Sequence, residues 1–156
     1  MKKWLFGLLI ICLGVLQLSP IGILNFFNLK PDLLLIACLA SVFFFRFKYA
    51  FLISIFCGLF KDAFLVYPAT LNTISFAAWS YIIFRVAKEI STDNILVKVG
   101  LVFLVALLQN IIMAVLSSYY GVISLGIYLR VIIFASIYTA FVSPLIFILS
   151  KKILDR

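Results

Sequence analysis

The stretch ILVKVGLVFLVALLQNIIMAVLS, residues 95–117, decides the fold class of this chain. It carries a single charged side chain, Lys98, and is longer than the roughly 20 apolar residues with which a helix crosses a bilayer. Strands of membrane barrels need only about ten residues. The stretch therefore predicts a transmembrane helix and argues against a barrel.

The rest of the chain repeats this pattern. Its 156 residues are 67% hydrophobic and 12% charged, whereas soluble domains are about half apolar and a quarter charged. Apolar stretches of helical length lie at residues 4–27, 31–45, 49–67, 69–84, 95–117 and 128–149. We therefore predict an all-α, polytopic membrane protein with six transmembrane helices, a single transmembrane helical domain at residues 1–156. The second and fourth stretches are short for a span, and Ser19-Pro20 predicts a kink or an early end of the first helix.

The basic residues give this bundle an orientation. Lys and Arg are more frequent in cytoplasmic loops, and alternate loops of six spans divide the 13 basic residues ten to three. We therefore expect residues 1–3, 46–48, 85–98 and 150–156, with both termini, in the cytoplasm. The three basic residues expected outside are Lys30, Lys61 and Arg130. Because the basic residues are scattered, they do not indicate nucleic-acid binding.

Small and polar residues inside the spans predict contacts between helices. Helices in lipid pack closely where small residues recur at helical spacing. Ser54 and Gly58 are expected to pack the third helix against its neighbours. The corresponding residues of the sixth helix are Ala135, Thr139 and Ser143. Intramembrane amides either bond across helices or line a site for a polar substrate, and these residues are Gln17, Asn25, Asn28, Asn72, Gln109 and Asn110. The three cysteines, all in apolar stretches, are expected to be small buried side chains.

The chain offers little for catalysis. It has no histidine, and its Asp and Glu residues number 5. Histidine is the commonest metal ligand and the usual acid–base group near neutral pH. No motif for a nucleophile, a metal or a phosphate-binding loop is present. We therefore expect no enzymatic activity, no metal and no cofactor.

Two carboxylates, Asp32 and Asp62, fall at one depth of the predicted bundle. Each lies fifteen residues from Phe47 at the tip of a cytoplasmic turn, or roughly 22 Å along a helix. One interpretation places Asp32 at the positive end of a helix dipole and lets Asp62 reach for water beside Lys61. In the other interpretation, both carboxylates lie at the border of one polar cluster. This cluster opens outward and is neutralised by Lys30, Lys61 or a basic group of a partner.

Two short motifs contain these carboxylates. KPDLLL, residues 30–35, begins the second predicted helix after a first helix that contains Gln17, and GLFKD, residues 58–62, lies near the end of the third. This pattern resembles the MreD family of bacterial rod-shape-determining membrane proteins, which are similar in length and in number of spans. The chain departs from the family after Asp62, where YPAT at residues 67–70 replaces a loop that often contains glycine.

The resemblance implies a scaffold rather than an enzyme. An MreD-like protein is a multi-pass protein of the bacterial inner membrane and belongs to the cell-elongation (rod) complex for peptidoglycan synthesis and cell shape. Its partner is the bitopic membrane protein MreC, and through MreC it meets the MreB filament, RodA and a class B penicillin-binding protein. The layout is also similar to that of the substrate-binding subunits of energy-coupling-factor (ECF) vitamin transporters. The alternative function is therefore that of a substrate-binding membrane subunit of an ECF-type transporter.

Overall fold

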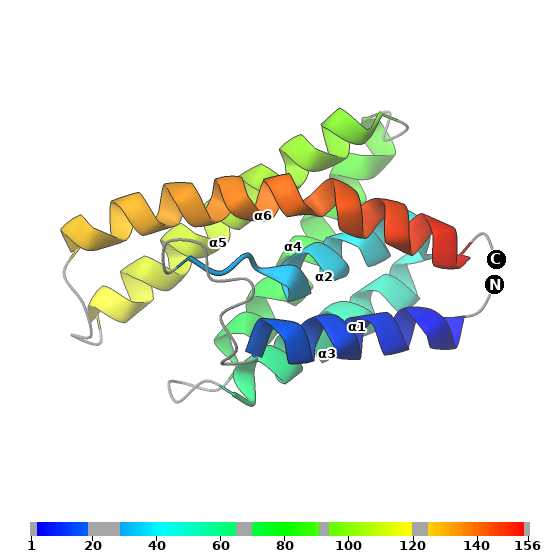
Figure 1. Cartoon of the computed structure of the whole chain (residues 1–156), viewed down its shortest axis with the longest axis horizontal. Helices are drawn as coiled ribbons and strands as arrows, with labels where there is room; N and C mark the ends of the chain where they lie inside the picture. Colours follow the sequence, from blue (N-terminus) through cyan, green and yellow to red (C-terminus); the bar gives the residue numbers. More distant parts are fainter. Residues whose placement is uncertain (1–2, 19–28, 65–69, 91–93, 120–124, 155–156) are drawn as a thin grey trace.

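The computed structural model describes residues 3–18, 29–64, 70–90, 94–119 and 125–154, and these residues form six helices (Figure 1). The predicted all-helical class is confirmed for this part of the chain, and the six apolar stretches correspond to the six helices in order. The helices are α1 (Lys3–Leu18), α2 (Leu33–Phe44), α3 (Phe47–Asp62), α4 (Leu71–Glu89), α5 (Ile95–Tyr119) and α6 (Leu125–Leu154).

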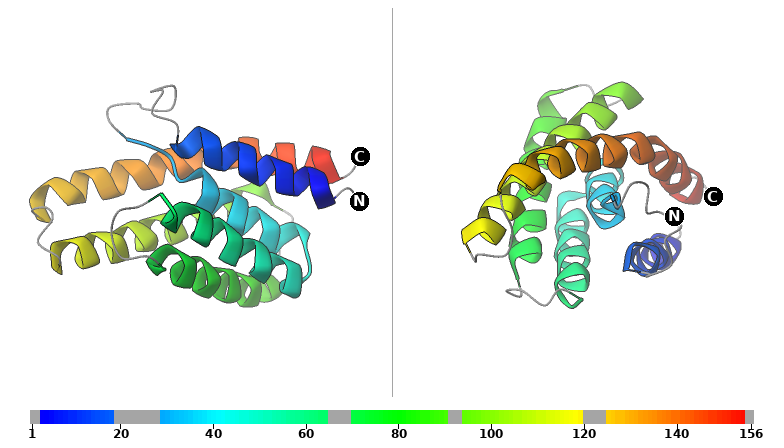
Figure 2. Two further views of the ribbon diagram at one scale, coloured as in Figure 1. Left: turned by 90° about the horizontal axis from the view of Figure 1, so that it is seen from below. Right: turned by 60° about the vertical axis from the view of Figure 1, so that its left-hand side comes forward.

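The helices differ in length. Within α5 and α6, Ile95–Leu116 and Ile132–Leu154 are each long and apolar enough to cross a membrane. The 12 residues of α2 extend over only ~18 Å, in line with the shortness of the second apolar stretch. Both Figure 1 and Figure 2 show the α5–α6 hairpin extending beyond α1 and α3 at one end, while α1 begins and α6 ends at the other.

The short helix α2 is the centre of the bundle. All its residues from 33 to 42 are buried, and it contacts all the other helices. Its sequence, LLLIACLASVFF, has no charged side chain, as expected of a helix that is apolar all round and therefore buried all round. The hairpins α3–α4 and α5–α6 cover it, and α1 lies along the outside against α2, α3 and α6 (Figure 2).

Small residues bring α3 and α4 into close contact. Ser54 and Gly58 are both buried on α3. A Cβ atom at Gly58 would lie 2.8 Å from the backbone nitrogen of Thr73, so only glycine lets α4 approach this closely. The Ser54 hydroxyl donates to the carbonyl oxygen of Ala50 at 2.7 Å and so satisfies its own hydrogen bond inside the bundle. Gly58 therefore lies at the α3–α4 contact, whereas Ser54 lies against α2, where its hydroxyl accepts from the Cys38 thiol at 3.1 Å.

The second small-residue stripe lies on α6. Thr139 and Ser143 are buried, and Ala135 is partly buried. Their hydroxyls donate back to the helix, Thr139 to the Ala135 carbonyl and Ser143 to the Ala140 carbonyl, each at 2.7 Å. Because these polar groups are satisfied locally, α6 can place them against neighbouring helices, and the helix continues through Pro144 without interruption.

Two sequence-based expectations are corrected. The fourth helix was expected to end at residue 84, but α4 runs to Glu89 because its charged last turns make contacts at helical spacing. Arg85 donates to the Tyr81 hydroxyl at 3.2 Å, and the Lys88 ammonium lies 4.7 Å from the ring centroid of Phe84. Cys12 is exposed, unlike the other two cysteines, because the outer face of α1 is itself apolar. The kink expected at residues 19–20 lies outside the described residues, as do Asn25 and Asn28.

Candidate functional site

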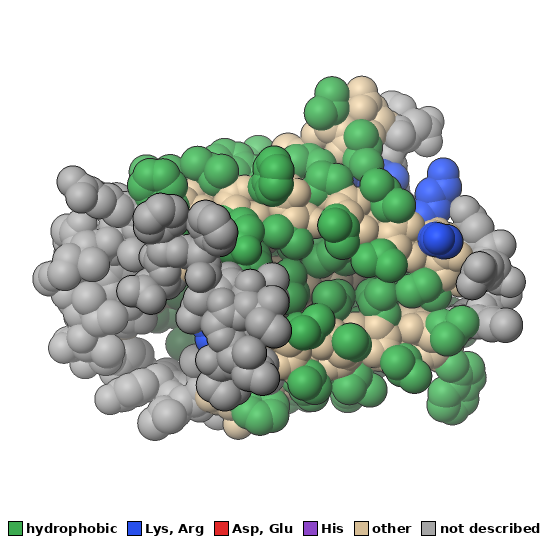
Figure 3. Space-filling view, viewed as in Figure 1, with side chains coloured by type: hydrophobic (Ala, Val, Ile, Leu, Met, Phe, Trp, Pro, Cys, Tyr) green, Lys and Arg blue, Asp and Glu red, His purple; other side chains and the backbone are tan. Residues whose placement is uncertain are grey.

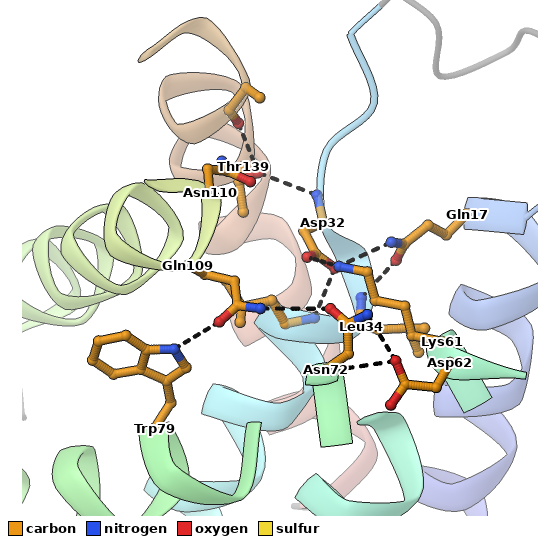
Figure 4. Close-up of polar contacts among 12 residues, drawn as sticks. Gln17, Asp32, Leu34, Lys61, Asp62, Asn72, Trp79, Gln109, Asn110 and Thr139 are labelled. Atoms are coloured by element: carbon orange, nitrogen blue, oxygen red, sulfur yellow. Dashed lines mark hydrogen bonds and ion pairs between the residues drawn. The ribbon is translucent and has the colours of Figure 1, made fainter. Parts of the chain in front are cut away.

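Polar side chains from all six helices meet where α1 and α3 end and α2 and α4 begin (Figure 4). Most belong to residues that are largely or wholly buried. We call this group the six-helix cluster, and it consists of Gln17, Asp32, Lys61, Asp62, Asn72, Thr73, Trp79, Gln109 and Thr139.

Asp32 caps the N-terminus of α2. Its carboxylate accepts a hydrogen bond from the backbone N–H of Leu35 at 3.2 Å, the usual bond of an N-cap side chain. Its own backbone N–H donates to the Thr139 hydroxyl at 3.1 Å, which ties this turn to the middle of α6. The interpretation that Asp32 serves the positive end of a helix is confirmed.

Gln17, at the end of α1, completes the cap of α2. Its amide nitrogen donates to Asp32 at 3.1 Å, and its amide oxygen accepts from the backbone N–H of Leu34 at 2.9 Å. The first N–H groups of a helix have no partner within that helix. Two of them in α2 are satisfied by side chains, one of which comes from a different helix.

Lys61 gives Asp32 its counter-charge. The two side chains form an ion pair and are only 19% and 14% exposed. The Lys61 ammonium also lies 5.3 Å from the centroid of the Phe76 ring on α4. A carboxylate this far from water needs a paired cation. Lys30, the other cation expected here, is exposed at the described end of the loop before α2.

Asp62 closes the beginning of α4, although it lies at the end of α3. Its two oxygens accept from the backbone N–H groups of Asn72 at 3.2 Å and Thr73 at 2.9 Å, and from their side chains at 2.8 and 2.6 Å. Thr70, the N-cap residue by position, has a φ of 97° and makes no capping bond through its side chain. Asp62 of α3 therefore caps the N-terminus of α4, a role that usually belongs to the residue directly before the helix.

A chain of amides continues from Asp62 into the α4–α5 contact. The Gln109 amide donates to the Asn72 amide oxygen at 3.5 Å and accepts from the Trp79 indole N–H at 2.8 Å. The adjacent residue of α5, Asn110, donates to the Ser136 hydroxyl of α6 at 3.0 Å. The prediction that intramembrane amides bond across helices is confirmed for these residues and for Gln17.

The structure brings together three of the four residues that the sequence singled out at this end. Asp32 and Lys61 are paired, and Asp62 follows Lys61 in the chain but turns to α4. Asp62 is 7% exposed, so the interpretation in which it reaches for surface water is wrong. No sequence pattern indicates the role of Trp79, which follows from the hydrogen bond that its indole N–H donates to Gln109.

The polar groups of the six-helix cluster bond to one another and to helix ends, and so connect the helices. The oxygens of both carboxylates accept from helix N–H groups, amides or the Lys61 ammonium. In the part of the chain that the structure describes, no three His, Cys, Asp or Glu side chains gather as a metal would require. The arrangement fixes the relative positions of the helices.

Comparisons with known proteins do not assign the chain to a family. No protein-family model, curated protein or solved structure matches it. The resemblance to the MreD family therefore rests on the motifs at residues 30–35 and 58–62. These two motifs contain Asp32, Lys61 and Asp62, the three charged members of the six-helix cluster.

Proposed function

We propose that this chain is a non-enzymatic membrane scaffold of the MreD type, which spans the bacterial cytoplasmic membrane six times and binds a bitopic MreC-like partner. The observation that carries the proposal is the six-helix cluster, because Asp32, Lys61 and Asp62 of the two motifs all take part in the contacts that join its helices. A bundle held together in this way provides a stable binding surface in the membrane. In this proposal, the partners that bind to it carry out peptidoglycan synthesis.

The surface of the bundle supports a position in the membrane. Large apolar side chains point outward on the longest helices and on α1, among them Phe141 at 82% and Trp4 at 92% exposure. On the face shown in Figure 3, hydrophobic side chains cover α1 and α6, and most visible basic side chains lie toward the end where α1 begins and α6 ends. An apolar surface with cations at one end fits a bilayer and the excess of cytoplasmic Lys and Arg.

The interior favours a scaffold over an ECF-type substrate-binding subunit. A subunit that takes up a vitamin needs unengaged polar groups around a pocket. In the six-helix cluster, Asp62, Asn72 and Gln109 are 7%, 3% and 1% exposed and are bonded to one another or to helix ends. These groups are already satisfied, and a polar ligand would have to displace helix caps in order to use them.

Isolation of the full chain from membranes tests the function. We expect a bitopic protein to co-purify in stoichiometric amount, and Asp62→Asn to reduce its recovery more than Glu89→Gln, a change at an exposed carboxylate on the last turn of α4. Loss of the chain should disturb cell shape without abolishing a reaction that the isolated chain performs. A tightly bound vitamin-sized molecule, or turnover of a substrate by the chain alone, would contradict the proposal.

Cysteine labelling tests the six spans independently. Lys30 and Lys48 are both exposed and lie on opposite sides of α2, so each can carry a single cysteine once Cys12, Cys38 and Cys57 are replaced. An impermeant thiol reagent should label Lys30→Cys in intact cells and Lys48→Cys only after permeabilisation. The reverse pattern would refute the orientation, and equal labelling of both would refute the span formed by α2.

A further inference from the structure

A hollow in the bundle lies between α1 and the turn that joins α2 to α3. It measures about 210 Å³ and is lined by Phe6, Gly7, Ile10, Phe45, Tyr49 and Ile53. Gly7 also borders a larger hollow of about 430 Å³ on the outer side of α1. A Cβ atom at Gly7 would meet nothing within 4 Å, so the space beside this residue is open. The lining is apolar except for the Tyr49 hydroxyl.

The mouth of this hollow lies beside cations. Arg46 directly follows the lining residue Phe45 in the chain, Lys48 directly precedes the lining residue Tyr49, and both cations are exposed. Tyr49 is 48% exposed, and tyrosine side chains concentrate where the hydrocarbon of a bilayer meets its headgroups. The hollow therefore has an apolar interior, and two exposed cations are chain neighbours of its lining residues.

The cations at this mouth differ from others at the same end of the bundle. The Lys98 ammonium lies 5.5 Å from the Phe44 ring centroid, and the Lys88 ammonium lies over the Phe84 ring. Among the described residues, Arg46 and Lys48 have neither an ion pair nor an aromatic ring of this kind.

We propose that this hollow binds one anionic phospholipid of the surrounding leaflet. An acyl chain enters between α1 and α3 beside Gly7, and the phosphate and its net negative charge lie against Arg46 and Lys48. The planar guanidinium of arginine suits a phosphate, and basic side chains near a membrane surface attract anionic lipids. The site rests on the proposed position of the chain in a membrane, since lipid is its ligand.

Competition between two lipids tests the headgroup. The purified full chain is equilibrated in micelles with equal amounts of phosphatidylglycerol and phosphatidylcholine, and the retained lipids are counted by native mass spectrometry. We expect one tightly retained lipid with a preference for phosphatidylglycerol that falls about fivefold for each charge removed in Arg46→Gln and Lys48→Gln. Arg85→Gln with Lys88→Gln is the matched control, because it removes the same two residue types from the end of α4.

A second pair of variants tests the acyl-chain site. Gly7→Leu should fill the hollow and remove the retained lipid, whereas Gly100→Leu, at an exposed glycine that also faces open space, should leave it bound. Equal retention of the two lipids, or equal effects of the two leucine variants, would overturn the site. If the chain inserts in membranes and co-purifies with its bitopic partner but shows no preference for phosphatidylglycerol, the lipid site is refuted and the proposed function is not.

Discussion

Replacement of Asp62 by alanine should be among the most damaging single changes in this chain. The carboxylate accepts from four donors, which are the backbone N–H groups and the side chains of Asn72 and Thr73. Loss of a helix cap costs about 1 kcal/mol, and each buried donor left without an acceptor costs about 1–3 kcal/mol. Since Asn72 is 3% exposed, water does not replace the lost acceptor, and we expect a loss of roughly 3–5 kcal/mol.

Asp62→Asn separates geometry from charge. The asparagine keeps one oxygen for the Asn72 donors, but its NH₂ group then faces the Thr73 N–H that the second oxygen accepted at 2.9 Å. One buried donor is therefore left facing another, and the expected loss is roughly 2 kcal/mol. The free energy of unfolding can be measured by titrating the purified protein with SDS in mixed micelles, with the fluorescence of Trp79 in a Trp4→Phe background as the signal.

Thr70 supplies the decisive control. It occupies the N-cap position of α4 but makes no capping bond with its side chain, so Thr70→Ala should change the free energy of unfolding by less than about 0.5 kcal/mol. If α4 were capped locally, the same change would cost about 1 kcal/mol. A cost for Thr70→Ala equal to that of Asp62→Ala would refute the assignment of the cap to α3.

Three further predictions use the same unfolding titration. Lys61→Met should cost about 1–2 kcal/mol, and in that background Asp32→Asn should cost about 1 kcal/mol less than in the natural sequence, since the ion pair is already gone; additive costs would count against the pair. Gly58→Ala should destabilise by about 1–3 kcal/mol because its methyl group meets the α4 backbone, whereas Gly100→Ala, which meets nothing, should stabilise by about 0.5–1 kcal/mol. Thr70→Gly should stabilise by about 0.5–1 kcal/mol through relief of the positive φ, and a loss of stability would show that no strain is held there.

The two helix caps show how far the sequence could predict this structure. The beginning of α2 is a local pattern, in which Pro31 precedes Asp32 and the acceptor lies three residues before the donor, so residue types alone indicate it. The beginning of α4 is not local. Its acceptor lies ten residues before Asn72, on the previous helix, and no periodicity relates the two positions.

The same reasoning applies to the amides. Their residue type and their place in apolar stretches predict that each one finds a partner, because lipid offers none. The partner itself depends on how the helices are arranged. Gln17 reaches α2 because α1 ends beside the first turn of that helix, and Gln109 reaches Trp79 because α4 and α5 pack together there. Composition therefore predicts that these amides form hydrogen bonds, and the arrangement of the helices determines the partner of each one.

The unequal lengths of the helices have a consequence for the lipid around them. The described helices α1 and α3 each have 16 residues, or ~24 Å, whereas the apolar spans Ile95–Leu116 of α5 and Ile132–Leu154 of α6 have 22 and 23 residues, or ~33 and ~35 Å. A hydrocarbon core of about 30 Å is thicker than the first pair and thinner than the second. In the proposed position across a membrane, such hydrophobic mismatch costs fractions of a kcal/mol per Å, and we expect lipid to thin beside α1 and α3 and the α5–α6 hairpin to tilt or to thicken the lipid beside it. The proposed scaffold would then set a different bilayer thickness on its two sides.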